Sequence, residues 1–301
     1  NRIATTSLTL LSLLVHSGSG GKGKKPNIDN YQGSSISRYG CEFLILPPIK
    51  QLFTKSAGKF IFQRYFSKFI TPEKFIPQPE FKWVLFTPDM TEEALNYAAS
   101  SIFISIDIET IRDDPNRTID CVGFSFVILG EQSYTLTQVV IPLNIKDNPE
   151  AALYNLEVIR AICASPSPKV FQNGKYDNCY LLRYNSPVTN WLGDTIDLFH
   201  SWYSELPKSL DFIATFCIRS WQYWKDESTS GDKLQYYEYN AKDCFATSLC
   251  WLALLIEVPS FAINNYLQEF PLVFPCLHVE MMGLLRDNEE MDKEAARFEA
   301  S

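Results

Sequence analysis

The stretch Ile102-Phe103-Ile104-Ser105-Ile106-Asp107-Ile108-Glu109-Thr110 decides how this chain of 301 residues folds. Its apolar, β-branched residues predict a buried strand that ends in two carboxylates separated by one residue. Because alternate side chains of a strand point to one face, Asp107 and Glu109 lie side by side. Such anions repel each other unless a cation, usually a hard divalent metal, neutralises them. The stretch therefore predicts a metal site.

Charge divides the chain into two unequal parts. Residues 1–70 carry 10 Lys and Arg against 2 Asp and Glu, whereas residues 71–301 carry 17 against 33. We therefore expect a small basic N-terminal α/β segment over residues 1–70 and a proline-containing linker over residues 71–80. The acidic larger part does not bind nucleic acid by bulk charge. If it handles phosphates, bound metal ions must reverse the local sign.

From residue 81 the pattern alternates between strands and helices, and then becomes helical. Three neighbouring strands followed by strand-helix units predict the α/β class, with a mixed sheet flanked by helices. The expected strands are Phe81 to Phe86, Ile102 to Glu109, Ile119 to Leu129, Tyr134 to Ile141 and Val170 to Gln172. The expected helices are Thr91 to Ser100, Pro149 to Ala164, Lys175 to Arg183, Thr195 to Tyr203, Leu210 to Cys217 and Leu234 to Val258.

Further acids occupy later helices where the core pattern turns them inward. Asp177 lies early in a helix that follows a strand, and Tyr239 and Asp243 are four apart, so they share one helical face. With Asp107 and Glu109 these side chains match what two-metal phosphodiester hydrolysis requires, because two divalent ions clamp the scissile phosphate. Mg²⁺ or Mn²⁺ suits an all-oxygen site. Tyr239 is expected to orient the attacking water through its hydroxyl.

Each motif alone has an ordinary structural interpretation. Asp107 and Glu109 could end a strand and cap a turn, Asp177 could stabilise a helix N-terminus, and Tyr239 could be a core aromatic. The three spacings together, in order and on suitable elements, favour the metal site over these interpretations.

The order Asp107-x-Glu109, Asn173-x-x-x-Asp177 and Tyr239-x-x-x-Asp243 resembles the three motifs of the DEDD exonuclease superfamily in its tyrosine-bearing subclass. The resemblance implies an RNase H-like exonuclease fold and a catalytic set of Asp107, Glu109, Asp177, Tyr239 and Asp243. The four acids among them would hold two metal ions.

More specific segments resemble the proofreading domain of family A, DNA polymerase I-like, enzymes. They are Gln172 to Asp177, Asp194 to Asp197 and Ser209-Leu210, and the resemblance covers roughly residues 81–260. The resemblance implies that the chain is a 3′-5′ exonuclease domain over residues 81–262.

Two flanks refine the match. Residues 268–287 resemble the helix that opens the polymerase domain of these enzymes, so we expect residues 263–301 to be the truncated start of one. Residues 31–34 and 43–48 weakly resemble the tail of a uracil-DNA-glycosylase-like domain fused to some phage-type polymerases. The chain departs from that family at Pro48-Ile49-Lys50, where the family has His-Pro, so glycosylase chemistry is not carried over.

Four residues are candidates for substrate binding, each beside an ordinary alternative. Thr110 is placed to meet the terminal nucleotide, or is a turn residue. Asn173 could bind the substrate backbone, or form a turn with the glycine after it. Trp224 and Lys225, in an aromatic and basic cluster, could stack single-stranded bases or pack in the core.

The leading hypothesis is a 3′-5′ exonuclease acting on single-stranded or mismatched DNA 3′ ends. It releases nucleoside 5′-monophosphates, as the proofreading part of a phage-type polymerase whose polymerase domain shares the full-length chain. One alternative is an RNA-trimming exonuclease of the RNase D kind. Another is a non-catalytic domain that binds primer ends or supports an adjoining polymerase.

Cysteine usage indicates the compartment. The eight Cys form no CxxC pair and the three His are too few for a zinc site of the usual spacing. Reduced thiols fit an intracellular, cytoplasmic protein that is not secreted, located in the host cytoplasm if a phage encodes it. No run approaches the roughly 20 apolar residues of a membrane span, so no membrane partner is expected.

Overall fold

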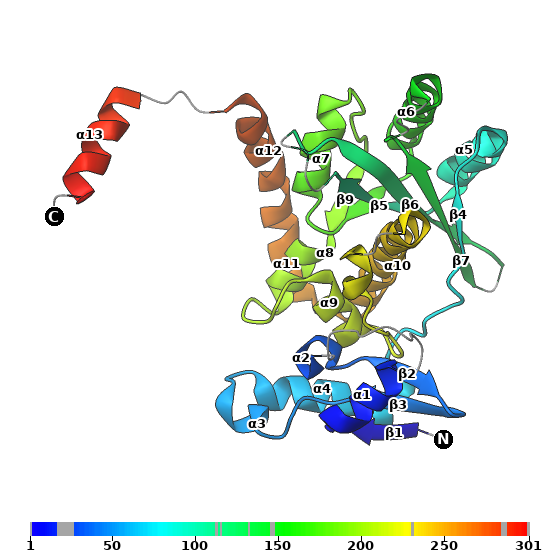
Figure 1. Cartoon of the computed structure of the whole chain (residues 1–301), viewed down its shortest axis with the longest axis vertical. Coiled ribbons are helices and arrows are strands. Elements are labelled where there is room, and N and C mark those ends of the chain that lie inside the picture. The colour runs from blue at the N-terminus through cyan, green and yellow to red at the C-terminus, as the bar shows by residue number, and fades with distance from the viewer. Residues whose placement is uncertain are drawn as a thin grey trace.

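The computed structural model describes residues 2–16, 27–111, 114, 116–131, 133–144, 148–229, 232–283 and 288–299. It contains a small three-stranded sheet near the N-terminus and a larger six-stranded sheet that carries most of the core (Figure 1). No helix in these ranges is both long and apolar enough to cross a membrane.

The larger sheet has the strand order β4-β7-β6-β5-β8-β9. Its strands are β4 (Trp83–Leu85), β5 (Phe103–Thr110), β6 (Ile119–Leu129), β7 (Tyr134–Pro142), β8 (Lys169–Phe171) and β9 (Trp191–Asp194). Strands β5, β6 and β7 pair antiparallel, whereas β8 and β9 continue the sheet in parallel from β5. This mixed sheet confirms the predicted α/β class and has the RNase H-like arrangement.

The sequence did not predict β9, and four of the five predicted strands differ in extent from the observed strands by one to three residues. Strand β9 has only four residues, so it offers almost no alternation to detect. The expected strand Phe81 to Phe86 shortens to β4, and the strand bearing the acids runs one residue further, to Thr110.

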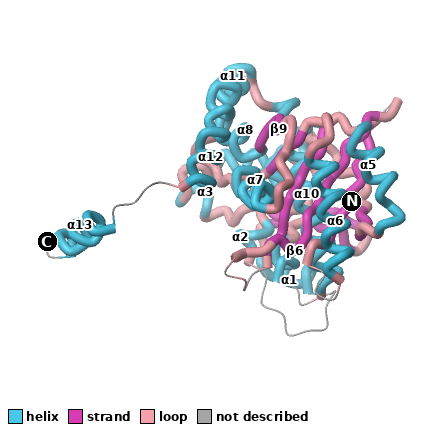
Figure 2. The backbone as a smooth tube through the Cα atoms, turned by 90° about the horizontal axis from the view of Figure 1, so that it is seen from above, coloured by secondary structure: helices cyan, strands magenta, loops and turns pink. Residues whose placement is uncertain are grey.

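Helices cover both faces of this sheet (Figure 2). On one side Tyr97 of α5 (Thr91–Ser100) contacts Phe126 of β6, with ring centroids 5.7 Å apart. Helix α6 (Pro149–Cys163) lies beside α5 and packs on β7. On the other side the long α10 (Lys233–Glu257) crosses β5, β6 and β7. The carboxylates of β5 therefore face α10, because they alternate with the isoleucines of the opposite face.

Small side chains let α10 approach the sheet closely. A Cβ on Gly123 of β6 would lie 2.3 Å from Asn240 Oδ1 and 2.7 Å from Cys244 Sγ, both on α10. Next to it, the Ser105 hydroxyl donates to the Cys244 carbonyl at 2.6 Å and lies 2.8 Å from the Ser248 hydroxyl. These contacts fix the position of α10 over the acid-bearing strand.

Five further helices pack around the ends of the sheet. They are α7 (Gly174–Arg183), α8 (Thr195–Trp202), α9 (Leu210–Cys217), α11 (Ser260–Glu269) and α12 (Val273–Met282). The last helix, α13 (Asn288–Glu299), lies apart from the main body (Figure 1). Helix α12 lies against α7, and its Phe274 meets Trp191 of β9 at 5.5 Å between ring centroids. The polymerase-like stretch 268–287 is helical up to Met282, and residues 284–287 lie outside the described residues.

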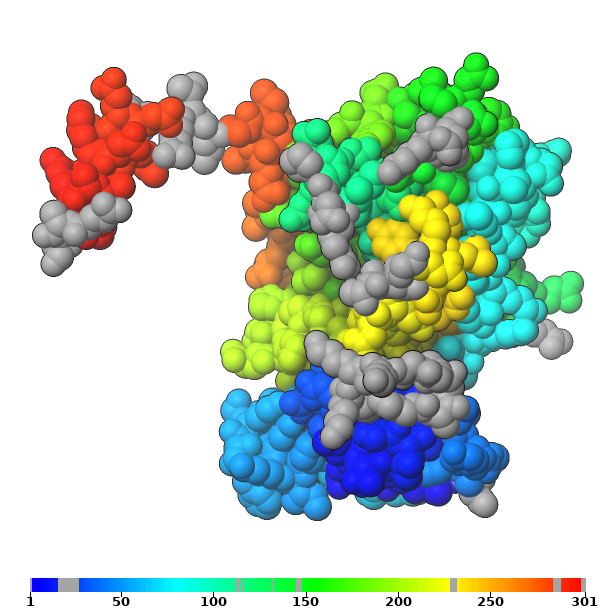
Figure 3. Space-filling view, viewed as in Figure 1, coloured from blue at the N-terminus to red at the C-terminus, as the bar shows by residue number. Residues whose placement is uncertain are grey.

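The N-terminal segment forms a small α/β unit that packs below the main body (Figure 3). Its strands are β1 (Arg2–Thr5), β2 (Ser35–Arg38) and β3 (Cys41–Ile45), in the order β1-β3-β2. Its helices are α1 (Leu8–His16), α2 (Ile28–Tyr31), α3 (Gln51–Thr54) and α4 (Gly58–Ile70).

Two basic residues of α4 attach this unit to the main body. Arg64 donates to Glu257 of α10 at 2.5 Å and to the Phe216 carbonyl at 3.0 Å. Lys68 is fully buried, and its ammonium donates to the carbonyls of Gly33 and Thr215. The attachment therefore places an amino group away from water.

The first prediction concerns the approach of α10. Gly123→Ala introduces a methyl group where Asn240 and Cys244 already lie, so we expect it to lower the free energy of unfolding by about 1–3 kcal/mol. Urea titration measures this loss. The exposed Ser133→Ala, in the turn after β6, is the control and should change stability by less than about 0.5 kcal/mol. Equal stability of the two variants would contradict the close packing.

The second prediction concerns the pH dependence of stability. Burial lowers the pKa of Lys68 from its usual 10.5 to about 7. Between pH 7 and 10.5 the unfolded chain therefore binds a proton that the folded chain does not, so stability rises with pH. Relative to Lys68→Met, the free energy of unfolding of the wild type should increase by about 2 kcal/mol from pH 7 to pH 8.5. Lys59 is exposed on the same helix, so Lys59→Met should leave the pH dependence of stability unchanged. If the difference in unfolding free energy between the wild type and Lys68→Met does not change with pH, the lowered pKa of Lys68 is refuted.

Candidate active site

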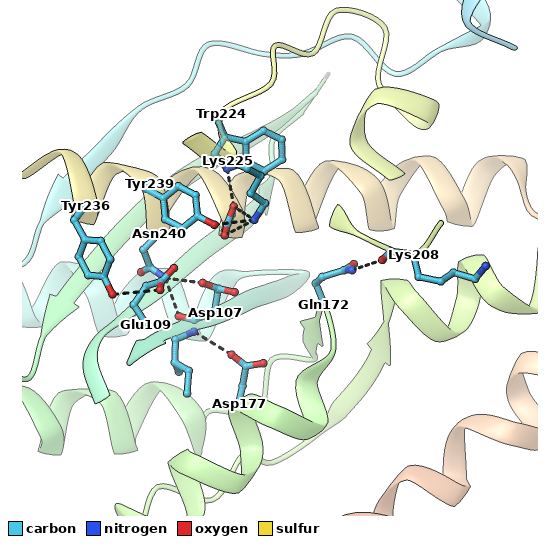
Figure 4. A network of polar contacts seen from close by, with 12 residues as sticks. Asp107, Glu109, Gln172, Asp177, Lys208, Trp224, Lys225, Tyr236, Tyr239 and Asn240 are labelled. Atoms are coloured by element: carbon cyan, nitrogen blue, oxygen red, sulfur yellow. Dashed lines mark hydrogen bonds and ion pairs between the residues drawn. The ribbon is translucent and has the colours of Figure 1, made fainter. Parts of the chain in front are cut away.

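The structure brings the five residues of the predicted catalytic set to one region between β5, α7 and α10 (Figure 4). Asp107 and Glu109 come from β5, Asp177 from the first turn of α7, and Tyr239 and Asp243 from α10. Asp107 and Glu109 share one face of β5, and Tyr239 and Asp243 share one face of α10, so the two pairs meet in a single site.

Three of the four acids form a close group. One carboxylate oxygen from each of Asp107, Glu109 and Asp243 lies within 4.8 Å of one from each of the others. Asp243 is only 4% exposed, whereas Asp107 and Glu109 are half-buried. Oxygen donors at this spacing fit a hard divalent cation.

Asp177 is held differently and lies outside that group of three. Its Oδ1 accepts a hydrogen bond from the backbone amide of Ile108 at 3.0 Å. That amide is available because β8 pairs with β5 only at Ile104 and Ser105, so the sheet opens before it reaches the acids. The opening admits the N-terminal turn of α7 and places Asp177 against the acid-bearing strand.

The acids share negative charge in a region poor in water. Burial raises the pKa of Asp107 well above its usual value, and repulsion from Asp243 and Asp177 adds to the effect. Burial and the Asp243 charge likewise raise the pKa of Glu109 to about 8, and burial raises the pKa of Asp177. A bound cation would relieve this repulsion, so the electrostatics and the donor geometry agree.

Tyr239 remains a neutral phenol at this site. Burial, followed by the Asp243 charge, raises its pKa above the usual range. The ring is 7% exposed, and the hydroxyl accepts a hydrogen bond from Lys225 at 3.0 Å. The hydroxyl proton is therefore retained and can be donated to a water molecule or a phosphate oxygen.

Lys225 lies inside the acid cluster, where its ammonium takes in part the place of a metal ion. Its Nζ lies 2.8 Å from Oδ1 and 2.7 Å from Oδ2 of Asp243. Burial opposes the charged ammonium, but the attraction of Asp243 outweighs it and raises the pKa of Lys225. Lys225 thus neutralises part of the acid group.

Of the two uses considered for Trp224, base stacking and core packing, its burial favours core packing. The indole is 3% exposed, and its Nε1 donates to Asp243 Oδ1 at 2.6 Å. It packs against Trp221 with ring centroids 5.0 Å apart. Trp224 therefore positions Asp243, and the bases have no access to its face.

Two residues that the sequence analysis missed hold the strand acids from α10. Asn240 Nδ2 donates to Asp107 Oδ2 at 2.7 Å, and the Tyr236 hydroxyl donates to Glu109 Oε2 at 3.2 Å. With Tyr239 and Asp243 they follow an i, i+3, i+4, i+7 spacing on one face of α10. Extending the helical face by one turn would have found both.

The last two predicted substrate residues occupy different surroundings. The Thr110 hydroxyl lies 3.3 Å from the Tyr176 hydroxyl, beside the acids. Asn173 is exposed and adopts a left-handed conformation with φ of 65° just before α7. Its side chain makes no capping bond, so its observed contribution comes from the backbone.

Asp194 fixes the start of α7 and was recognised in sequence only as part of a family segment. Its carboxylate accepts from the amides of Asn173 at 3.0 Å, Gly174 at 2.6 Å and Ile196 at 2.9 Å. It thereby joins the N-termini of α7 and α8, one turn before Asp177. Asp194 is a positioning residue for the acid on α7.

The third prediction tests whether Lys225 compensates the acids. Lys225→Met leaves the carboxylates without their internal cation, so we expect a loss of about 2 kcal/mol in unfolding free energy in EDTA. Mn²⁺ should then raise the melting temperature more in this variant than in the wild type, because binding to the folded state adds stability. Thermal unfolding with and without Mn²⁺ measures both effects.

Lys242→Met is the matched control, because Lys242 neighbours Asp243 on α10 but pairs with Glu227 and Glu238 instead. The same Mn²⁺ response in all three proteins would show that Lys225 does not share the site with a cation.

Comparisons with known proteins find partial similarity among solved structures alone. No protein-family model matches the chain, and no curated protein matches it. Among solved structures, the catalytic core of RRP6 from Trypanosoma brucei is 13% identical, with a TM-score of 0.49 over 68% of this chain and 57% of that one. Brucella melitensis NrnC with bound Mg²⁺ is 16% identical, with a TM-score of 0.46 over 67% and 94%. Escherichia coli RNase D is 17% identical, with a TM-score of 0.43 over 69% and 52%.

Proposed function

We propose that this chain is a metal-dependent 3′-5′ exonuclease that releases nucleoside 5′-monophosphates from single-stranded 3′ ends. The observation that supports it best is the group formed by Asp107, Glu109 and Asp243, whose carboxylate oxygens lie within 4.8 Å of one another beside the buried Tyr239. Carboxylates at this spacing, with a neutral phenol, suit hydrolysis of a phosphodiester.

Asp107, Glu109 and Asp243 would hold one Mg²⁺ or Mn²⁺ ion, and Asp177 with Asp107 would hold a second. Asp177 lies close enough to Asp107 for its charge to raise the pKa of Asp107. Such ions activate water and stabilise the leaving oxygen when bound. The protein supplies an oxygen-lined site with fixed acids, since Asn240 orients Asp107 and the Ile108 amide orients Asp177.

The neutral Tyr239 would orient the attacking water by hydrogen bonding. Its proton is held by burial, so the hydroxyl can donate to the water while the water attacks. Lys225, already 3.0 Å from that hydroxyl, would place positive charge near the phosphate oxygens once it leaves Asp243. Both residues act on the reacting group without themselves giving up a proton.

For the biological substrate we propose DNA, with the chain acting as the proofreading part of a family A polymerase in the cytoplasm. The resemblance of Gln172 to Asp177 and of residues 268–287 to such enzymes supports this. In the structure Lys175 pairs with Glu280 of α12 at 2.5 Å, which ties the polymerase-like stretch to the helix bearing Asp177. RNA trimming of the RNase D kind is the alternative, and a substrate panel separates the two.

The fourth prediction tests the proposed activity. With Mg²⁺, the wild type should release mononucleotides from a 3′-mismatched DNA primer, and EDTA should abolish release. Asp107→Asn should lower the rate at least about 100-fold, because it removes charge at the reacting centre. Labelled products resolved by gel and by chromatography give both rate and product.

Asp89→Asn is the control, an exposed acid before α5 that should keep the wild-type rate. Equal rates for Asp107→Asn and wild type would overturn the assignment of the site. Faster degradation of a matched RNA oligonucleotide would replace proofreading by RNA trimming while keeping the exonuclease.

A further inference from the structure

A second feature lies beside the acids and is not used by the proposed hydrolysis. It is a cleft of about 570 Å³ where the connection between β5 and β6 faces α7. The cleft is lined by Asn116, Arg117, Thr118, Tyr180, Arg183 and Tyr184.

Two tyrosines of α7, Tyr176 and Tyr180, lie between the acid site and the cleft. Thr110, directly after Glu109, lies 3.3 Å from the hydroxyl of Tyr176, which directly precedes Asp177. The ring of Tyr176 lies 4.8 Å from that of Tyr180, one turn further along α7. A chain leaving the acids along α7 therefore meets the tyrosines first and the cleft next.

The chemistry of the cleft differs from the rest of this acidic protein. Two exposed guanidinium groups, Arg117 and Arg183, face it, and none of the lining residues that the structure describes carries a carboxylate. The Arg183 guanidinium lies 4.9 Å from the centre of the Tyr180 ring. Arginines beside half-buried aromatic rings combine phosphate binding with surfaces on which bases stack.

Two hydrogen bonds hold the backbone on either side of Arg117. Asp114 accepts hydrogen bonds from the backbone amides of Asn116 and Thr118, each at 2.9 Å. Arg117 between them has φ of 46°, a left-handed conformation that residues other than glycine rarely adopt. The carboxylate of Asp114 thus stabilises the backbone on both sides of Arg117, whose exposed side chain lines the cleft.

We propose that this cleft binds the nucleotides upstream of the 3′ end of a single-stranded nucleic acid, with Arg117 and Arg183 contacting phosphates and Tyr180 stacking a base. The direction of the strand rests on the proposed function, because the 3′ end must lie at the acids. From Asp177 to Arg183, α7 rises about 9 Å, so the arginines lie beyond the terminal nucleotide. The enzyme then holds a single strand longer than the unit it removes.

The fifth prediction measures binding without hydrolysis. In EDTA, fluorescence anisotropy of 5′-fluorescein oligothymidylates should show that the wild type binds a hexanucleotide at least about tenfold tighter than a dinucleotide. Arg183→Gln and Arg117→Asn should each remove most of this length-dependent gain. Each should also lower the salt dependence of hexanucleotide binding by about 0.7, the value for one phosphate contact on a single strand. Asparagine is chosen because it tolerates the positive φ.

Arg297→Gln is the control. Arg297 pairs with Glu294 on α13, so this substitution removes the same positive charge at a site away from the cleft. Equal affinities of the wild type for the two lengths, or cleft variants that behave like this control, would overturn the proposal. The proposal would also be overturned if the arginine variants lost the same factor of affinity for the dinucleotide as for the hexanucleotide. Oligodeoxyuridylates and oligouridylates run in parallel differ only in the 2′-hydroxyl, so they show which sugar the cleft prefers.

The two proposals fail separately. Hydrolysis that depends on Asp107, with binding indifferent to Arg117 and Arg183, keeps the exonuclease and removes the cleft. Length-dependent binding that needs both arginines, in a protein that releases no mononucleotide, keeps the cleft and removes the exonuclease.

Discussion

The site depends on how closely α10 lies against β5 and β6. A side chain at Gly123 would collide with Asn240 and Cys244, and the Ser105 hydroxyl reaches a carbonyl of α10 directly. Protein interiors are packed so tightly that one extra methyl group here must move the helix or the strand. Since the helix carries Tyr239 and Asp243 and the strand carries Asp107, a packing contact sets the distances on which the chemistry depends.

Bringing the acids together has an electrostatic cost, and the protein offsets it with donors from several elements. Asn240 and Tyr236 each serve one strand acid, while Trp224 and Lys225 serve Asp243. The bonds of Lys225 to Asp243 involve a charged ammonium and are therefore stronger than neutral hydrogen bonds. They do not remove the repulsion, because the pKa values of Asp107 and Glu109 remain raised. The folded chain is thus prepared for a cation by the same close packing that makes the acids repel each other.

How much of this could be predicted follows from how local each signal is. The alternation in β5 placed Asp107 and Glu109 on one face, and the four-residue spacing in α10 placed Tyr239 with Asp243. Both rules depend only on the period of one element. The sequence gives no such rule for Trp224, which follows an irregular segment and turns inward because of its tertiary contacts. Strand β9 and the role of Gly123 could not be predicted for the same reason, because residues distant in the chain determine both.

The acids differ in what holds them, and the difference shows where the site can rearrange. Asp177 accepts from a backbone amide, on a helix whose start is fixed by three amides bonded to Asp194. Backbone donors of a packed strand and helix cannot turn away without unfolding those elements. Asp243 instead has both oxygens engaged by the ammonium of Lys225, a flexible side chain with several rotatable bonds. A cation or phosphate that entered the site would therefore exchange partners on the side of α10, while the side of α7 and β5 would stay fixed.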